Sequence, residues 1–109
     1  MYYENREIQE TYNKWQGANA METRVAVMGI IVEDRMSVGA LNELLHEYGD
    51  SIVGRMGIPY RKRNISIISI AIDAPQDVIS ALAGKIGRLP GIQVKTAYSG
   101  VFFHDEAGR

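Results

Sequence analysis

The sequence contains no cysteine. This absence excludes disulfides, thiolate metal sites, iron–sulfur ligation by cysteine and a cysteine nucleophile. No run of about 18 apolar residues is present that could cross a membrane as a helix, and the first residues lack the apolar segment of a signal peptide. Lys and Arg total 12 against 13 Asp and Glu, so charge gives no bias toward nucleic acid. We therefore expect a cytoplasmic protein without a membrane partner.

Hydrophobic residues make up 46% of the 109 residues, which is enough for the core of one domain. Three zones follow from composition: a polar extension over residues 1–20, a core-rich domain over 21–98 and a tail over 99–109. In the extension, Ile8, Tyr12 and Trp15 have helical spacing, so it is either a loose end or an amphipathic arm that docks on this domain or a partner. The tail carries Val101, Phe102 and Phe103, and is either a packed segment or loose.

Two stretches, 25–32 and 65–72, are apolar at both alternating sets of positions. A strand that is apolar on both faces belongs in a sheet that is covered on both faces. Between and after these stretches the pattern predicts a helix capped by Ser37 and ended by a left-handed Gly49, and a hairpin whose first strand is 52–60 with Ile52, Met56, Ile58 and Tyr60 on one side. It then predicts a helix capped by Asp73 with Pro75 in its first turn, and a strand over 92–98.

The predicted order βαββαβ indicates an α+β, ferredoxin-like fold: a four-stranded antiparallel sheet with two helices on one face. Connection rules place the first and third strands in the centre and the other two at the edges. Two helices leave the second face of the sheet bare. We expect a second copy of the chain to cover it, with Met28, Ile30, Ile68 and Ile70 at the dimer interface, or else the chain's own tails.

Three segments carry a resemblance to a known family. They are EDRMSVGALNELLHEY at 33–48, RMGIPY at 55–60 and ISALAGKIGRLPGIQVKT at 79–96. Together they resemble the small regulator family of iron-only hydrogenase systems, over residues 22–98. The resemblance implies an ACT-like domain, similar to the ligand-sensing half of nickel-responsive repressors. It further implies a homodimer or homotetramer with a regulatory role.

A nickel site of the repressor kind is not expected in this chain. Without cysteine, its only imidazole ligands are His46 and His104. His46 falls on the side of the first predicted helix away from much of the apolar stripe, and one histidine among scattered carboxylates is not the clustered ligand set of a transition metal. We predict no metal site, and the sequence identifies no cofactor.

The connection from Glu33 to Ser37 is the predicted small-ligand site. It joins a central strand to a helix N-terminus, where free amides attract anions. The resemblance to ACT-like domains implies an effector pocket in the same region. We expect Asp34, Arg35 and Ser37 to bind the ligand, with Arg35 and Ser37 contacting a carboxylate or phosphate; in the alternative interpretation the loop only caps the helix.

The predicted hairpin turn carries Arg61, Lys62 and Arg63, which could contact phosphate or could simply be solvated. A nucleic-acid partner is not expected, because the extension is too short for a helix-turn-helix. No nucleophile elbow, phosphate loop or paired-carboxylate motif occurs, so we expect no catalytic residues and no enzyme. Two functions remain: a homo-oligomeric sensor of a small-molecule effector, or a ligand-free scaffold that binds a protein of the hydrogenase maturation machinery through the arm or the tail.

Overall fold

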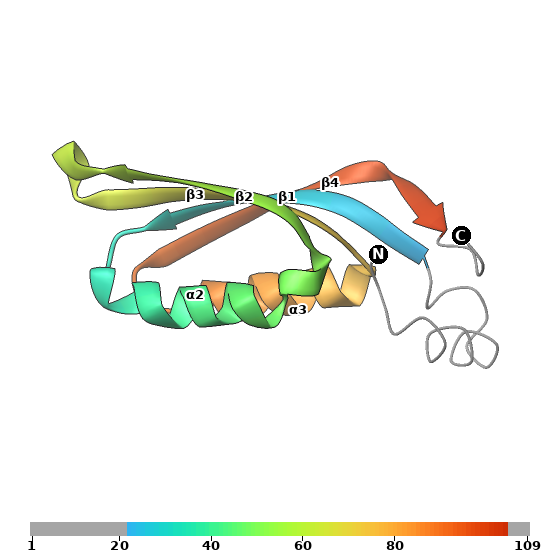
Figure 1. Ribbon diagram of the computed structural model, residues 1–109, viewed down its shortest axis with the longest axis horizontal. Helices are drawn as coiled ribbons and strands as arrows, with labels where there is room; N and C mark the ends of the chain where they lie inside the picture. The colour runs from blue at the N-terminus through green and yellow to red at the C-terminus, as the bar shows by residue number, and fades with distance from the viewer. Residues whose placement is uncertain (1–21, 105–109) are drawn as a thin grey trace.

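The computed structural model of the protein describes residues 22–104. The predicted order of strands and helices is confirmed, with three short 3-10 turns added between them (Figure 1). The elements are β1 (Glu22–Val32), η2 (Arg35–Ser37), α2 (Val38–Glu47), η3 (Gly49–Ser51), β2 (Ile52–Tyr60), η4 (Arg61–Arg63), β3 (Ile65–Ala74), α3 (Gln76–Gly87) and β4 (Ile92–His104).

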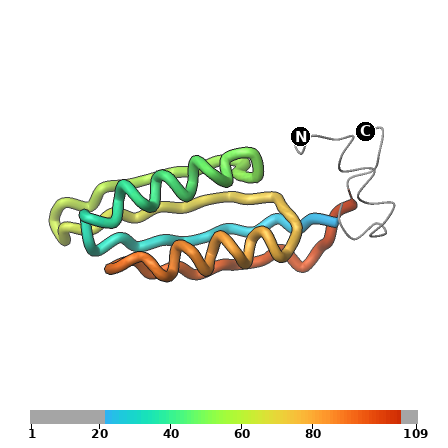
Figure 2. The backbone as a smooth tube through the Cα atoms, turned by 90° about the horizontal axis from the view of Figure 1, so that it is seen from below, coloured from blue at the N-terminus to red at the C-terminus, as the bar shows by residue number. Residues whose placement is uncertain are grey.

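The four strands form one antiparallel sheet in the order β2-β3-β1-β4. The doubly apolar strands β1 and β3 are central, as predicted. Both helices lie under the same face of the sheet (Figure 1), side by side along the strands (Figure 2). The ferredoxin-like α+β fold is therefore confirmed. Among the described residues, no helix is long and apolar enough to span a bilayer.

The core lies between the helices and the sheet. Every second residue of β1 and β3 points into it, and these side chains meet the apolar stripes of α2 and α3. Removing them from water is the main favourable term in folding this domain. The largest fully buried side chains are Met28, Ile30, Leu41, Ile70, Ile72, Ile79, Leu82 and Ile86.

The predicted face of β2 is wrong at its first residue. The register with β3 shifts between Ile52 and Gly54, which leaves Val53 as an extra residue in the strand. A bulge of this kind reverses the alternation. Ile52 is therefore opposite the buried Ile72, while Met56 and the residues that alternate with it face away from the helices.

The predicted helix ends are also wrong in detail. Ser37 occupies the N-cap position of α2, but its side chain makes no capping bond. Asp73 lies in β3 and Pro75 is the N-cap residue of α3. Gly49 has no positive φ, since among the described glycines only Gly91 has one. The strand β3 extends two residues further than the apolar run, which moves the start of α3 downstream.

Candidate functional site

The sheet face that the helices leave uncovered is the first candidate surface. We call it the open face, and the strand register defines its side chains as three rows that cross β2, β3, β1 and β4 in turn. The rows are Gly54, Ala71, Val27 and Ala97; Met56, Ser69, Gly29 and Lys95; Ile58, Ile67, Ile31 and Gln93.

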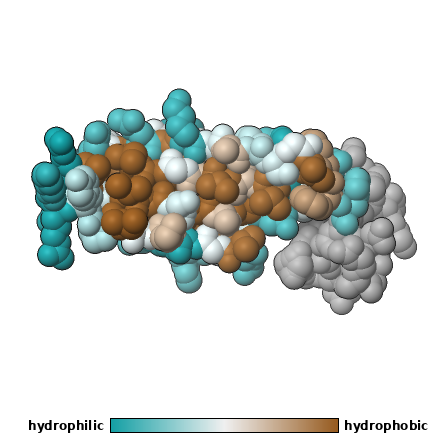
Figure 3. All heavy atoms as spheres, turned by 90° about the horizontal axis from the view of Figure 1, so that it is seen from above, coloured by the Kyte–Doolittle hydropathy of each residue, from teal (hydrophilic) through white to brown (hydrophobic). Residues whose placement is uncertain are grey.

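The open face is apolar and accessible. Met56 is 62% exposed, Ile58 52% and Val27 45%, and Ile67 on the central strand β3 is 37% exposed. Figure 3 shows apolar side chains gathered in clusters along this face. Lys95, on the edge strand β4, is the one charged residue in the three rows. A contiguous apolar surface on a small domain is typical of an interaction site.

The predicted interface residues lie on the other face. Met28, Ile30 and Ile70 are fully buried and Ile68 is 8% exposed, because all four point toward the helices. A second chain cannot reach them without displacing α2 and α3. The four named residues therefore face the helices, and the residues that alternate with them along β1 and β3 form the open face.

The connection from Glu33 to Ser37, predicted to bind a ligand, is a closely packed loop that we call the joint. The Ser37 hydroxyl, which is buried, donates a hydrogen bond of 2.6 Å to the carbonyl of Pro90. The Asp34 carboxylate accepts a bond of 2.9 Å from the Met36 amide, as a cap on η2. The joint packs so closely that a Cβ on Gly91 would collide with Asp34. These bonds favour the capping interpretation of the loop, and of the three predicted ligand residues only Arg35 is exposed.

Arg61, Lys62 and Arg63 form the turn η4 at the tip of the β2–β3 hairpin. All three are exposed, and the tip projects beyond the ends of the helices (Figure 1). Asn64 closes the turn with a φ of 59°, a conformation that asparagine tolerates. The tip brings no other candidate site residue beside these three cations.

The strand β4 continues six residues past the predicted end, to His104. The guanidinium of Arg24 lies 4.5 Å from the ring centroids of both Tyr98 and Phe102. It donates to the side chain of Gln76, at 2.6 Å, and to the carbonyl of Ser99, at 2.7 Å. Arg24 thus ties the end of β4 to β1 and α3. Of the two segments expected to recruit a partner, residues 99–104 of the tail are therefore part of β4, and the arm with Ile8, Tyr12 and Trp15 lies outside the described residues.

The two histidines lie apart from any cluster of ligands. His46 is exposed on α2, and the Nε2 of His104 lies 3.6 Å from the carboxylate of Glu22. Within residues 22–104, no group of three metal-binding side chains is present.

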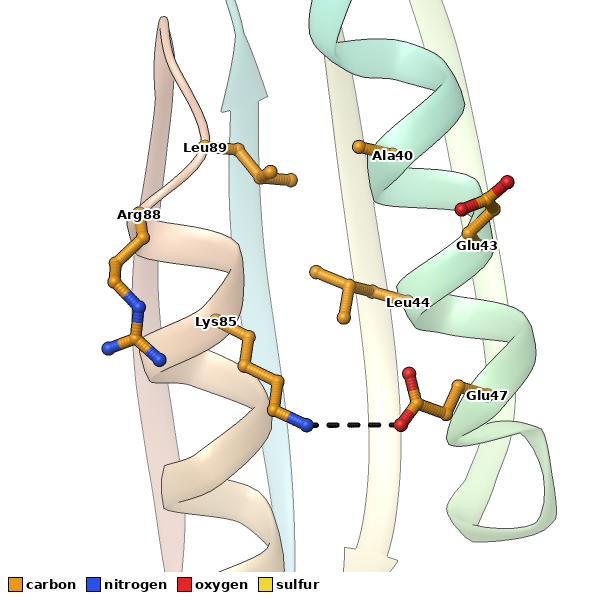
Figure 4. Close-up of a pocket in the computed structure, with 7 residues that line it drawn as sticks. All are labelled: Ala40, Glu43, Leu44, Glu47, Lys85, Arg88 and Leu89. Carbon is orange, nitrogen blue, oxygen red and sulfur yellow. Dashed lines mark ion pairs between the residues drawn. The ribbon is translucent and has the colours of Figure 1, made fainter.

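A groove between α2 and α3, on the outer side of the helix layer, was not predicted. Its volume is about 360 Å³, which lies in the lower part of the range of small-molecule sites. Figure 4 shows Leu44 and Leu89 pointing toward each other across it, with Ala40 near one end. The lining residues are Ala40, Glu43, Leu44, Glu47, Lys85, Arg88 and Leu89.

The two walls of the groove carry opposite charge. Glu43 and Glu47 come from α2, whereas Lys85 and Arg88 come from α3 and the residue that follows it. The Lys85 ammonium is 3.8 Å from the Glu47 carboxylate and 5.2 Å from the ring centroid of Tyr48. The pKa of Lys85 is raised, chiefly by a hydrogen bond with the Tyr48 side chain, with Glu47 adding to the shift and Arg88 opposing it. The helical spacing of these charges was visible in the sequence, but their meeting across two helices was not.

Comparison with known proteins identifies the family. Residues 24–96 match the model of the TM1266-like family, whose members are described as proposed iron-only hydrogenase system regulators. The solved structure of an uncharacterized protein, TM1266 from Thermotoga maritima, is 39% identical, with a TM-score of 0.67. The match covers 70% of this chain and 96% of that one. No match was found among curated proteins.

Two more distant structures share the fold alone. A formyltetrahydrofolate deformylase from Pseudomonas putida KT2440 is 11% identical with a TM-score of 0.50, over 67% of this chain and 28% of that one. An unknown protein from Galdieria sulphuraria is 15% identical with a TM-score of 0.51, over 72% of this chain and 46% of that one. The family match spans β1 to β4 and the identity to the Thermotoga protein extends over nearly all of that protein. This chain therefore belongs to the TM1266-like family of proposed iron-only hydrogenase system regulators.

Proposed function

We propose that the protein is a non-catalytic regulatory module of an iron-only hydrogenase system that works as a homodimer, with the open faces of two copies packed together. The observation that carries the proposal is the apolar, nearly uncharged open face. The family match supports the regulatory role, and the cytoplasm is the compartment in which we expect it to act.

The cost of leaving the open face in water favours pairing. Met56, Ile58, Val27 and Ile67 are large apolar side chains, all more than a third exposed. Full burial of such a side chain contributes about 1.5 to 3 kcal/mol. Covering four partly exposed ones therefore adds several kcal/mol to a domain whose own stability is about 5 to 15 kcal/mol.

The size and charge of the open face fit a second copy. The whole uncovered side of the sheet, with the open face at its centre, has four strands about 4.8 Å apart that pair over about nine residues, and it spans on the order of 600 Å² in projection. A standard interface buries about 800 Å² of accessible surface per partner, and accessible area exceeds projected area. A two-fold contact places the same patch on both sides, so a patch that is neutral at its centre meets no like charge. Lys95 lies at the β4 edge, where it can stay in water.

Light scattering coupled to size exclusion tests the pairing. The full chain should elute with twice the 12.1 kDa mass of one chain. Ile67→Lys places a charge on the central strand β3 within the open face and should reduce the mass to that of a single chain, with an unchanged circular dichroism spectrum. A wild-type protein that stays monomeric at high concentration would remove the proposal.

Ser80→Lys is the matched control. Ser80 is exposed on α3, on the opposite side of the domain from the open face. This substitution adds the same charge and should leave the dimer intact. Loss of the dimer in both variants would mean that net charge, and not the open face, controls the mass.

A ligand-free scaffold that recruits a hydrogenase maturation protein is the second candidate. The end of β4 favours it, because Val101 is 56% and Phe103 46% exposed, beyond the segment that matches the family model. Phe102 stacks on Arg24, so substitution of Val101 and Phe103 by serine changes the exposed surface and keeps that contact. Loss of co-purification of a maturation protein with this variant, with the dimer intact, would favour the scaffold.

A further inference from the structure

We infer that the groove between α2 and α3 binds a small zwitterion with an apolar group, for which an apolar α-amino acid is the simplest chemical class. The groove combines three features that such a ligand requires: acidic residues from α2, basic residues from α3 and its C-cap, and an apolar floor. Of the charged side chains, Lys85 and Glu47 point toward each other across the groove (Figure 4). It lies on the opposite side of the domain from the open face, so this inference does not depend on pairing.

The charged walls are each built from one helix. Glu43 and Glu47 are four residues apart and lie on the same side of α2. Lys85 and Arg88 are three residues apart on α3 and its C-cap. Like charges at these spacings repel one another. A ligand ammonium beside the two glutamates would relieve the repulsion on α2, and a ligand carboxylate beside the Lys85 ammonium would offset its repulsion by Arg88.

The contact that now bridges the groove is weak. The Lys85 ammonium and the Glu47 carboxylate are 3.8 Å apart, and their side chains are 40% and 61% exposed. A charge-assisted hydrogen bond between such groups is about 2.7 to 2.9 Å long. The pair is therefore a loose surface ion pair, which costs little to open. Within residues 22–104, neither Glu43 nor Arg88 takes part in an ion pair.

The floor supplies the apolar part of the site. Leu44 and Leu89 point toward each other from the two sides of the groove, and both are only partly buried against the core. An aliphatic or thioether side chain resting on them would bury apolar surface on both partners. Ala40 and Leu44 come from the same helix as the acidic wall, so the ligand ammonium and the ligand side chain would contact α2 together.

The walls also exclude other ligand classes. A dianion such as a nucleotide phosphate would meet Glu43 and Glu47 opposite its cationic partners, and a simple cation would meet Lys85 and Arg88. A wholly apolar compound would leave four charges partly desolvated, which is costly. The opposed charges thus select for a ligand that carries both signs.

Isothermal titration calorimetry of the full chain with L-leucine, L-methionine and L-phenylalanine tests the inference. We expect at least one of the three to bind. N-acetyl and amide derivatives of that amino acid each lack one charge and should bind about tenfold more weakly, because a hydrogen bond to a charged group contributes about 1.5 kcal/mol or more. No heat from any of the three at millimolar concentration, or equal binding of the blocked derivatives, would overturn the inference.

Substitutions locate the binding. Lys85→Gln and Glu43→Gln should each weaken binding about tenfold, whereas the matched controls Lys95→Gln and Asp73→Asn, which remove one charge of each sign outside the groove, should leave it unchanged. Equal effects of groove and control variants would contradict the assignment. The monomeric Ile67→Lys variant should bind as the wild type does, so a failure of the dimer and a failure of the groove remain distinguishable.

Discussion

The two faces of the sheet are made by the same strands from similarly apolar residues, yet only one of them is a core. In β1, Met28 and Ile30 are fully buried against the helices, whereas Val27, which directly precedes Met28, is 45% exposed. In β3, Ile70 is fully buried and Ile67 is 37% exposed. The comparison shows that hydrophobicity alone does not determine burial here, since the position of the helices selects one set of alternating residues.

Truncating one isoleucine on each face of the sheet should give the largest difference in the free energy of unfolding. Ile70→Ala removes buried methyl groups from the core and should lower the free energy of unfolding by about 2 to 5 kcal/mol. Ile67→Ala, measured by urea unfolding at concentrations where the chain is monomeric, should lower it by about 0.5 kcal/mol or less. At high concentration the Ile67 variant should lose additional stability, because the dimer is weakened. Equal losses in the two variants at low concentration would mean that the open face is covered within one chain.

A substitution in the joint, at the end of the sheet face that the helices cover, should lower the free energy of unfolding by an intermediate amount. Ser37→Ala removes the 2.6 Å hydrogen bond to Pro90 and leaves a carbonyl without its partner. The bond is only partly buried, so its loss should cost about 1 kcal/mol, the net contribution of an ordinary hydrogen bond. Ser80→Ala removes an exposed hydroxyl of the same kind on α3 and should change the unfolding free energy by about 0.5 kcal/mol or less. An unchanged free energy of unfolding for Ser37→Ala would mean that this hydrogen bond does not stabilise the loop. The loop would then again be a candidate ligand site.

A substitution of Lys85, on the outer surface of the helix layer, should have the smallest effect on the free energy of unfolding. This effect should depend on pH. The pKa of Lys85 is raised above 10.5, mainly by its hydrogen bond with Tyr48. A raised lysine pKa adds stability that is complete below the unfolded value of 10.5 and disappears as the pH rises through the higher folded value. The stability difference between wild type and Lys85→Gln should therefore be larger at about pH 9 than at about pH 11.5 in urea titrations. A difference that stays constant over this range would exclude a specific contact of the ammonium.

Much of the fold followed from the sequence because each element had a local signal. The doubly apolar runs marked the central strands, and the helical stripes ending in Tyr48 and Leu89 marked the two helices. The side of the sheet that each residue faces had almost no such signal. Ile30 and Ile31 are equally apolar, so their own side chains do not indicate which of them a helix will cover. The larger side chains of the set with Met28 and Ile70, against Gly29 and Ser69 in the other set, were the one available hint.

The candidate sites were harder to predict, because each depends on contacts between distant segments. Ser37 looked free for a ligand, and only the fold brings Pro90 within reach of its hydroxyl. The groove depends on Glu47 of one helix meeting Lys85 of the other, 38 positions further along the chain. The extra residue Val53 reverses the alternation within β2 and has no sequence signature of its own.

The position of Arg24 between two aromatic rings has a practical consequence for shortening the chain. Its Nε is already buried without a hydrogen-bond partner, and the remaining nitrogens depend on Gln76 and Ser99. Trimming the chain back to the boundary of the family match would remove Phe102 and leave a half-desolvated cation beside the first strand. The end of β4 and Arg24 therefore stabilise each other, and any engineered terminus or fusion should be placed after His104.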